Sequence, residues 1–365
     1  MSVGNIRVCR LVSTTAGAWH RICIAITARG SLGEAFMSKS FIRRTVIAVF
    51  AFALASPALA QDKVRFQTDW IPSGEHAMYY GGWAKGIYAK HGIDITITRG
   101  YGSGDTVTKL AGGAADFGVA DLAAVLTARA RTNVPIKTIA VLYNESPHSL
   151  FVLKSSGITS FKGLEGKKVS ITPGNSHRFY FPEVAKKAGT DPSKIVWTNM
   201  DGAAMAAQLI AKNVDAAPFY SIHSYYINKA AVKAGEEIVV LPFVAVGFKI
   251  YAASLITSDK MIAEKPDLVK RFLAASKEVF EWANANPEEA CKLHVQRFPE
   301  VELDDCMGSV RAVMKFVFND HSKEFGFGKE SPERLKFSWD TIAVANELKG
   351  DYDYKQAIDT KLMAK

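Results

Sequence analysis

The pattern of hydrophobic and polar positions from residue 62 onward predicts alternating strands and helices. Residues 64–68 alternate between apolar and polar side chains, as do residues 93–98, and each segment has the length of a strand. A helix over residues 77–91 is expected between them, because apolar residues recur there at helical spacing. Its apolar side comprises Met78, Trp83, Ile87 and Tyr88. This alternation is typical of an α/β fold.

The alternation continues to about residue 256, and the sequence after it is helical. Further strands are predicted over residues 115–120, 136–143, 168–171, 194–199, 214–220, 237–241 and 250–256. Further helices are predicted over residues 106–111, 122–130 and 201–211, with another that follows a loop at 172–181 and runs to 188. From residue 266 onward, apolar residues at core-facing spacing predict a series of amphipathic helices.

The length of the chain indicates two lobes. Removal of the first 60 residues would leave 305 of the 365 residues, which is more than one hydrophobic core usually serves. We expect a first lobe from residues 61–150 and 248–365, and a second lobe from residues 151–247. The crossings between the lobes are expected at residues 148–155 and 246–251.

Residues 37–60 have the features of a secretory signal peptide. Arg43 and Arg44 precede an apolar stretch, and Ala58-Leu59-Ala60 is a small-x-small cleavage site. The apolar stretch is too short to span a bilayer comfortably. We therefore expect an exported, periplasmic protein that is cleaved near Ala60. Residues 1–36 show no clear strand or helix pattern, and we interpret them as a non-native N-terminal extension.

Most of the net positive charge lies in the first 60 residues, which export would remove. The first 60 residues carry seven Lys or Arg and one Glu, so they contribute +6 of the net charge of +9 and leave +3 on the mature chain. Nucleic-acid or membrane-surface binding needs a clustered basic face. The mature chain mixes charges of both signs throughout, which argues against both roles.

The mature chain keeps two cysteines, Cys291 and Cys306. An oxidising compartment permits a disulfide between them, and two separate buried thiols are an equally good interpretation. The sequence contains no CxxC, HExxH or histidine-rich cluster. We therefore predict no metal site and no cofactor.

Several kinds of binding chemistry are concentrated in residues 67–80. A carboxylate, an indole, an imidazole and a phenol come from Asp69, Trp70, His76 and Tyr80. A helix begins directly after this loop, and helix N-termini offer unpaired N–H groups to ligands. Turn formation and core packing are the plain alternatives for each residue alone. Their concentration at one loop favours a ligand site.

Other polar loops also precede predicted helices. The glycine-rich loop at 100–105 either presents N–H groups to a ligand or is a flexible turn. Asp121 is placed to cap a helix, which is the more ordinary role. Packing is predicted for most of the aromatic and histidine residues at 223–226. The candidate ligand-binding residues from these loops are Ser103, Gly104, Asp121, Asn144, Asn175, His177, Arg178, Tyr180, Asp201 and Tyr220.

Four motifs occur in the order and spacing of a known family. They are Asp69-Trp70-Ile-Pro-x-x-Glu75-His76-Ala, Lys85-Gly86-Ile87-Tyr88 followed by Gly92-Ile93-Asp94, Gly102-Ser103-Gly104, and Ala115-Asp116-Phe117-Gly118 with Asp121. Together they resemble the solute-binding proteins of ABC importers, in the nitrate/sulfonate/taurine branch. The resemblance covers nearly all of the mature chain. It implies the α/β fold of periplasmic binding proteins of type II, with two lobes, two crossovers and a ligand cleft between them.

The Asp-Trp-x-Pro-x-x-x-His pattern is nearest the NMT1/THI5-like subgroup, which binds thiamine pyrimidine precursors. This resemblance implies a heteroaromatic solute held by Asp69, Trp70, His76 and Tyr80. It also implies a monomeric receptor that captures its solute by hinge closure. The partner would be an inner-membrane ABC permease with its cytoplasmic ATPase, and the receptor itself would not be an enzyme.

Two alternatives stay open. In the first, the same fold binds a small anion such as a sulfonate, nitrate or an aromatic carboxylate. Its ligands would be His177, Arg178 and the helix starts at Gly104 and Asp201. In the second, the chain resembles a pyrimidine synthase of a related fungal branch and uses His76 or His177. No paired nucleophile and base with diagnostic spacing supports an enzyme.

Overall fold

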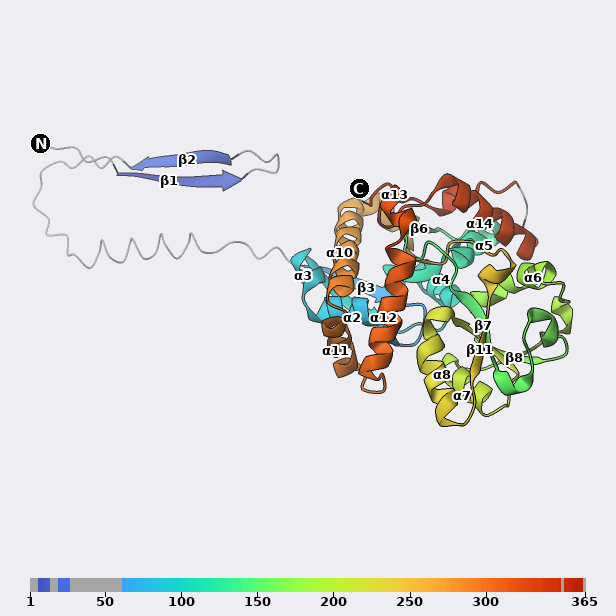
Figure 1. Ribbon diagram of the computed structural model, residues 1–365. Helices are drawn as coiled ribbons and strands as arrows, with labels where there is room; N and C mark the ends of the chain where they lie inside the picture. The colour runs from blue at the N-terminus through green and yellow to red at the C-terminus, as the bar shows by residue number, and fades with distance from the viewer. Residues whose placement is uncertain (1–5, 14–18, 27–60, 349–350, 364–365) are drawn as a thin grey trace, which may run out of the picture. The chain divides into compact units, whose positions relative to one another are not determined.

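The computed structural model describes residues 6–13, 19–26, 61–348 and 351–363 (Figure 1). The predicted signal peptide at 37–60 lies outside these residues. In the N-terminal unit, β1 (Ile6–Ser13) pairs with β2 (Trp19–Ile26) as an antiparallel hairpin. The interpretation that this region lacks a strand pattern is therefore wrong. Isoleucine or valine recurs at alternate positions in both strands, which favours extended backbone.

The first sheet of the larger unit is mixed. In spatial order it comprises β4 (Ile93–Thr98), β3 (Asp62–Gln67), β5 (Phe117–Asp121), β12 (Ala253–Ser258) and β6 (Ile136–Val141). Strand β3 lies parallel to β4 and β5. Strand β12 is antiparallel to β5 and β6. The antiparallel member is thus the strand that returns to this sheet late in the sequence.

The second sheet repeats this arrangement. In spatial order it comprises β11 (Ile238–Pro242), β7 (His148–Leu153), β10 (Ala216–Tyr220), β8 (Lys168–Ile171) and β9 (Val196–Asn199). Strand β8 lies parallel to β9 and β10, whereas β7 is antiparallel to β10 and β11. Two mixed sheets of this kind confirm the predicted α/β fold class.

The chain passes twice between the sheets. The first passage lies between the end of β6 and the start of β7, at residues 142–147. The prediction of a crossing at 148–155 is therefore wrong, because residues 148–153 form a fully buried strand of the second sheet. A short turn, η6 (Phe243–Val246), follows β11, and the second passage runs from it to the start of β12. Each passage leads into the antiparallel strand of the sheet that the chain enters.

Helices cover both sheets. Figure 1 shows α2, α10, α11 and α12 grouped beside β3, while α7 and α8 lie near β7, β8 and β11. The helices up to residue 233 are α2 (Ala77–Ala84), α3 (Ile87–Lys90), α4 (Ser103–Ala111), α5 (Leu122–Thr132), α6 (His177–Lys187), α7 (Gly202–Ile210) and α8 (Ser224–Lys233). The later helices are α9 (Asp259–Glu264), α10 (Pro266–Ala285), α11 (Pro287–Arg297), α12 (Leu303–Val317), α13 (Asp320–Phe325) and α14 (Pro332–Ala345). No helix in the described part of the chain is both long and apolar enough to cross a membrane.

The predicted helix at 77–91 is two helices. Helix α2 ends at Ala84 and α3 starts at Ile87, because Gly86 between them adopts a positive φ of 78°. The change of direction leaves Trp83 42% exposed instead of in the core. Met78, Ile87 and Tyr88 are buried as predicted. Helix α4 also starts at Ser103, three residues earlier than expected.

A disulfide joins two of the C-terminal helices. Cys291 on α11 and Cys306 on α12 are bonded, with their Cα atoms 5.7 Å apart. Both residues are fully buried in the core of the first sheet. The turn η1 (Gly74–His76) packs against α11 and α12. The disulfide therefore fixes the two helices that support the loop after β3.

Candidate ligand-binding site

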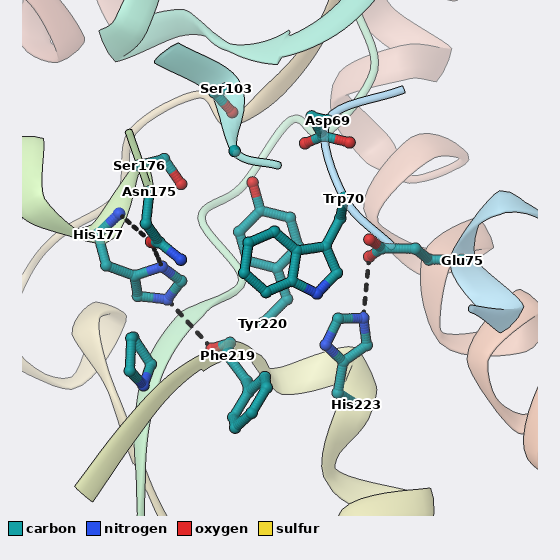
Figure 2. Close-up of a pocket in the computed structure, with 12 residues that line it drawn as sticks. Asp69, Trp70, Glu75, Ser103, Asn175, Ser176, His177, Phe219, Tyr220 and His223 are labelled. Carbon is teal, nitrogen blue, oxygen red and sulfur yellow. Dashed lines mark hydrogen bonds and ion pairs between the residues drawn. The ribbon is translucent and has the colours of Figure 1, made fainter. Parts of the chain in front are cut away.

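A small cavity lies where polar and aromatic side chains of both lobes meet (Figure 2). Its volume is about 30 Å³, which is room for about two water molecules. Ligand pockets usually measure about 300–1,000 Å³, so a solute requires the lobes to move apart. The cavity is lined by Asp69, Trp70, Glu75, Gly102, Ser103, Asn175, Ser176, His177, Pro218, Phe219, Tyr220 and His223.

The lining residues come from strand ends and helix starts in both lobes. Asp69 and Trp70 lie two and three residues after the end of β3, and Ser103 is the first residue of α4. In the second lobe, His177 is the first residue of α6, and Tyr220 is the last residue of β10. Ligands bind at this position in α/β folds, because helix N-termini and the carboxyl ends of parallel strands face it.

Two buried carboxylates dominate the wall of the first lobe. Burial raises the pKa of Asp69, against the contact with His76. Burial alone would raise the pKa of Glu75, but His223 and His76 hold it below its usual value. Burial would lower the pKa of His76, and the two carboxylates outweigh this effect and raise it. The wall therefore offers carboxyl oxygens as hydrogen-bond acceptors, and His76 behind them balances part of their charge.

The wall of the second lobe is formed by a neutral imidazole and aromatic rings. His177 Nδ1 lies 2.9 Å from Asn175 Oδ1, and its Nε2 lies 3.2 Å from the carbonyl oxygen of Phe219. Burial holds the pKa of His177 well below its usual range, and nearby His148 acts in the same direction. Figure 2 shows the indole of Trp70 in front of Tyr220, between the two walls.

Polar and steric contacts join the lobes around the cavity. His223 Nε2 of the second lobe lies 3.1 Å from Glu75 Oε2 of the first. The backbone N–H of Gly104 donates to the carbonyl of Gly174 at 3.0 Å. These contacts close the space between the lobes from two sides.

A buried cluster around Asp121 lies behind the cavity. The Asp121 side chain accepts a hydrogen bond from Ala123 N at the start of α5, as the predicted cap. It also accepts from the hydroxyls of Tyr180 and Tyr220, and His148 Nε2 lies 3.0 Å from it. Burial raises the pKa of Asp121 to about 8 and lowers the pKa of His148 to about 3. The pair is therefore mainly uncharged at pH 7.

The structure brings together six of the predicted ligand residues at the cavity. They are Asp69, Trp70, Ser103, Asn175, His177 and Tyr220. Four more lie directly behind its walls or at the lobe contact, and these are His76, Gly104, Asp121 and Tyr180. The remaining four, Tyr80, Asn144, Arg178 and Asp201, do not line the cavity.

These four residues have structural partners elsewhere. The Tyr80 ring packs against His294 of α11 and against Phe298, which directly follows this helix. Asn144 donates to the carbonyl of Val317. The other two are in the second lobe: the guanidinium of Arg178 lies 4.4 Å above the ring centre of Trp197, and Asp201 caps α7. Among the described residues that line the cavity, none is Lys or Arg.

Sequence reasoning missed six lining residues, which are Glu75, Gly102, Ser176, Pro218, Phe219 and His223. Glu75 and Gly102 belong to motifs that were recognised, so their position in the motif was the available signal. His223 was assigned to packing, because nothing local shows that it faces Glu75, 148 positions away.

Residues 73–290 match the family model described as "NMT1/THI5 like". The chain belongs to the NMT1/THI5-like family. The match spans the cavity residues of both lobes from Glu75 to His223.

Curated relatives of this family member include binding proteins and enzymes. It is 27% identical to the riboflavin-binding protein RibY of Chloroflexus aurantiacus, over 85% of this chain and 88% of the relative. It is 24% identical to the 4-amino-5-hydroxymethyl-2-methylpyrimidine phosphate synthase THI11 of Saccharomyces cerevisiae, over 74% of this chain and 84% of the relative.

Solved structures with the same fold include binding proteins for anions. The alkanesulfonate-binding protein SsuA of Xanthomonas axonopodis matches with a TM-score of 0.65 and 13% identity, over 82% of this chain and 99% of that chain. The periplasmic nitrate-binding protein NrtA of Synechocystis matches with a TM-score of 0.62 and 15% identity, over 83% of this chain and 87% of that chain. The NMT1/THI5-like chain therefore has the periplasmic-binding-protein fold.

In this NMT1/THI5-like protein, Gly202→Ala is expected to hinder lobe closure. A Cβ at position 202 would lie 2.6 Å from the Trp70 ring, across the gap between the lobes. Because this closed arrangement has no room for a solute, we expect the solute-free variant to have a larger radius of gyration by X-ray scattering than the unmodified protein. Gly112→Ala is the matched control, because its Cβ would meet only ordinary contacts. An unchanged radius of gyration in solute-free Gly202→Ala would contradict the closed geometry.

Proposed function

We propose that the mature chain is the periplasmic receptor of an ABC importer and captures a small heteroaromatic solute by hinge closure. One observation carries this proposal. The cavity between the lobes combines two carboxylates with aromatic side chains, and none of its described lining residues is Lys or Arg. Such a site suits a flat ring that carries hydrogen-bond donors, such as an aminopyrimidine.

The arrangement of the cavity weighs against an anionic solute. A sulfonate or nitrate would face the carboxyl groups of Asp69 and Glu75, and none of the described lining residues is a Lys or Arg that could bind it. Arg178, the cation that the anion hypothesis needs, is stacked on Trp197. The named anion-binding neighbours share the fold at 13–15% identity, and this likeness does not extend to the ligand.

The relatives support the class of ligand. RibY is named for riboflavin and the THI11 relative for a pyrimidine phosphate, and both compounds contain a pyrimidine-type ring. The predicted leader at 37–60 and the fold together support a location in the periplasm. Hinge closure then follows as a population shift, whose size equals the difference in solute affinity between the open and closed states.

A screen by thermal shift tests the ligand class. Residues 61–365 would be heated with aminopyrimidines, riboflavin, sulfonates, nitrate and aromatic carboxylates. A ligand at a hundred times its Kd adds about 2.7 kcal/mol to stability, which gives a clear shift. A response to sulfonate or nitrate alone would overturn the heteroaromatic assignment.

Trp70→Ala is expected to weaken binding of the solute found in this screen by about ten- to a hundredfold, because both ring burial and stacking are lost. Isothermal titration calorimetry measures the change. Trp83→Ala is the matched control, since Trp83 lies exposed on α2 outside the cavity. Equal affinities in the two variants would show that the solute does not contact Trp70.

The synthase names among the relatives favour an enzymatic alternative within the same family. The two roles differ in what happens to the bound compound. A receptor releases its solute unchanged after denaturation, whereas a synthase converts it. Mass spectrometry of the compound recovered from the purified protein separates the two, and recovery of a converted product would overturn the receptor proposal.

A further inference from the structure

Asp121, His148, Tyr180 and Tyr220 form a buried polar cluster that spans the two lobes, and we call it the interlobe cluster. Asp121 ends β5 of the first lobe, whereas His148 begins β7, Tyr180 lies on α6 and Tyr220 ends β10 of the second lobe. Asp121, His148 and Tyr180 are 0% exposed. The side-chain contacts of Asp121 therefore depend on the lobes being closed.

Three of the four groups that contact the Asp121 carboxyl group come from the second lobe. Its Oδ1 accepts from the Tyr180 hydroxyl, and its Oδ2 lies 3.2 Å from the Tyr220 hydroxyl and 3.0 Å from His148 Nε2. The backbone N–H of Ala123 donates to Oδ1 from within the first lobe. Opening of the cleft would thus leave Asp121 with its helix cap and replace the other partners by water.

The imidazole of His148 is oriented toward Asp121 by its other contacts. Its Nδ1 lies 2.8 Å from Ser146 Oγ, and its Nε2 lies 3.1 Å from Ser176 Oγ. The rings of His148 and Tyr180 meet edge to face, with their centres 4.6 Å apart. These contacts hold Nε2 at the surface of the second lobe that meets Asp121.

The other elements packed on the cluster bring no compensating cation. Among the described residues, no Lys or Arg forms an ion pair or hydrogen bond with the carboxyl group of Asp121. From α6, the ring of His177 lies 4.6 Å from that of His148. From α4, Ser103 accepts from the backbone N–H of Asp121.

The groups around Tyr220 add to the negative side of this balance. The ring of Tyr143 lies 6.0 Å from that of Tyr220, and the negative charges of Asp69 and Glu75 act on Tyr220 as well. A carboxylate enclosed beside them without a cation would be costly. A proton that neutralises the cluster removes this cost.

Asp121 and His148 can hold that proton together. On the carboxyl group it leaves two neutral side chains, and on the imidazole it makes an ion pair, so the pair has no net charge in either case. Burial raises the pKa of Asp121 to about 8 in the closed arrangement. Once water reaches both groups, the pair should lose the proton near the ordinary histidine pKa of 6.5.

We propose that closure of the cleft takes up one proton, which Asp121 and His148 share at the contact between the lobes. This inference rests on the hinge closure of the proposed receptor and adds a regulation of that closure by pH. The closed form binds more protons than the open form between pH 6.5 and 8, so rising pH favours the open form. The ratio of open to closed molecules should rise about tenfold over this interval.

Acid–base titration of the solute-free mature protein measures the proton. The comparison is with Gly202→Ala, in which a Cβ against the Trp70 ring holds the lobes apart. At about pH 7.2 the unmodified protein should bind about 0.7 proton per chain more than this variant. X-ray scattering of the same samples reports the opening, and Gly202→Leu places a larger side chain at the same contact if Gly202→Ala stays compact. Equal proton binding in the compact and the open protein would overturn the proposal.

Asp121→Asn locates the proton. Introduced into the unmodified protein and into the Gly202 variant, it should abolish the difference in proton binding. Asp116→Asn is the matched control, because it removes a carboxyl group that pairs with Arg65 inside the first lobe. A difference that persists in Asp121→Asn would place the proton elsewhere, for example at Glu75 and His223, and refute the proposal.

A measurement on the unmodified protein covers the case in which Asp121→Asn does not fold. By nuclear magnetic resonance, the carboxyl carbon of Asp121 and the ring of His148 are expected to show a joint transition near pH 8 while scattering reports the compact form. Transitions of both groups at their ordinary values in that compact form would refute the shared proton. None of these measurements uses a solute, so failure of the receptor role and failure of the proton site give different results.

Discussion

Replacing Asp121 by alanine is expected to lower the free energy of unfolding by about 3–5 kcal/mol. The substitution removes the cap of α5 and leaves buried His148, Tyr180 and Tyr220 without a shared partner. Because Asp121 belongs to the first lobe and the three partners to the second, closure should also suffer. Urea unfolding at pH 7, followed by circular dichroism, measures the loss.

Asp121→Asn is the matched control, because an amide keeps the cap and resembles the protonated carboxyl. We expect it to lose much less stability than Asp121→Ala. A loss below about 1 kcal/mol in Asp121→Ala would show that the cluster is not a supporting element of the fold.

The raised pKa of Asp121 also predicts that the free energy of unfolding depends on pH. The folded state holds a proton on Asp121 up to a pKa of about 8, whereas the ordinary value is 3.8, so stability falls as pH rises through this range. The low pKa of His148, about 3 against 6.5, makes stability rise with pH below 6.5 and offsets the loss there. Between pH 6.5 and 8 the titration of Asp121 alone should lower stability by about 1–2 kcal/mol.

The Asn variant should lose less over the same interval. Part of the pH dependence of stability remains in the Asn variant, because the raised pKa of His76 acts in the same direction. Urea midpoints measured from pH 6 to 8.5 give the comparison. Equal slopes in the two proteins would show that Asp121 does not hold the proton.

Removal of the disulfide is the second large effect that we expect. Cys291→Ala with Cys306→Ala should lower stability by about 3 kcal/mol, the loop-closure value for a loop of about 15 residues, and the two cysteines are 15 positions apart. Urea unfolding under oxidising conditions measures the difference. The unmodified protein unfolded with dithiothreitol should approach the double variant. A smaller difference than about 1 kcal/mol would mean that core packing alone holds α11 against α12.

Much of the fold follows from local pattern. Strands such as β3 and β4 were predicted because alternation with a period of two is set by neighbouring residues alone. The α/β class follows from the order of these elements. Helix α2 shows the limit, because the single Gly86 ends a periodic apolar pattern that continues in sequence and so leaves Trp83 exposed.

The candidate site could be predicted where neighbouring residues of a single loop supply several of its side chains. Asp69, Trp70 and Asn175 lie in loops between a strand and a helix, and His177 begins the helix after the second of these loops. The direction of Arg178 was not predictable, because the phase of α6 turns it toward Trp197 instead of the cavity. One helical position, about 100° of rotation, separates His177 from Arg178.

The sequence by itself determined the α/β architecture, the family, and the loop after β3 as a candidate binding element, because each depends on residues close together in the chain. Only the tertiary structure decided which residues meet across the cleft. Glu75 faces His223, Asp121 gathers three partners from the second lobe, and Gly202 meets the Trp70 ring. Such pairings depend on how the two lobes close on each other, and no local pattern encodes that geometry.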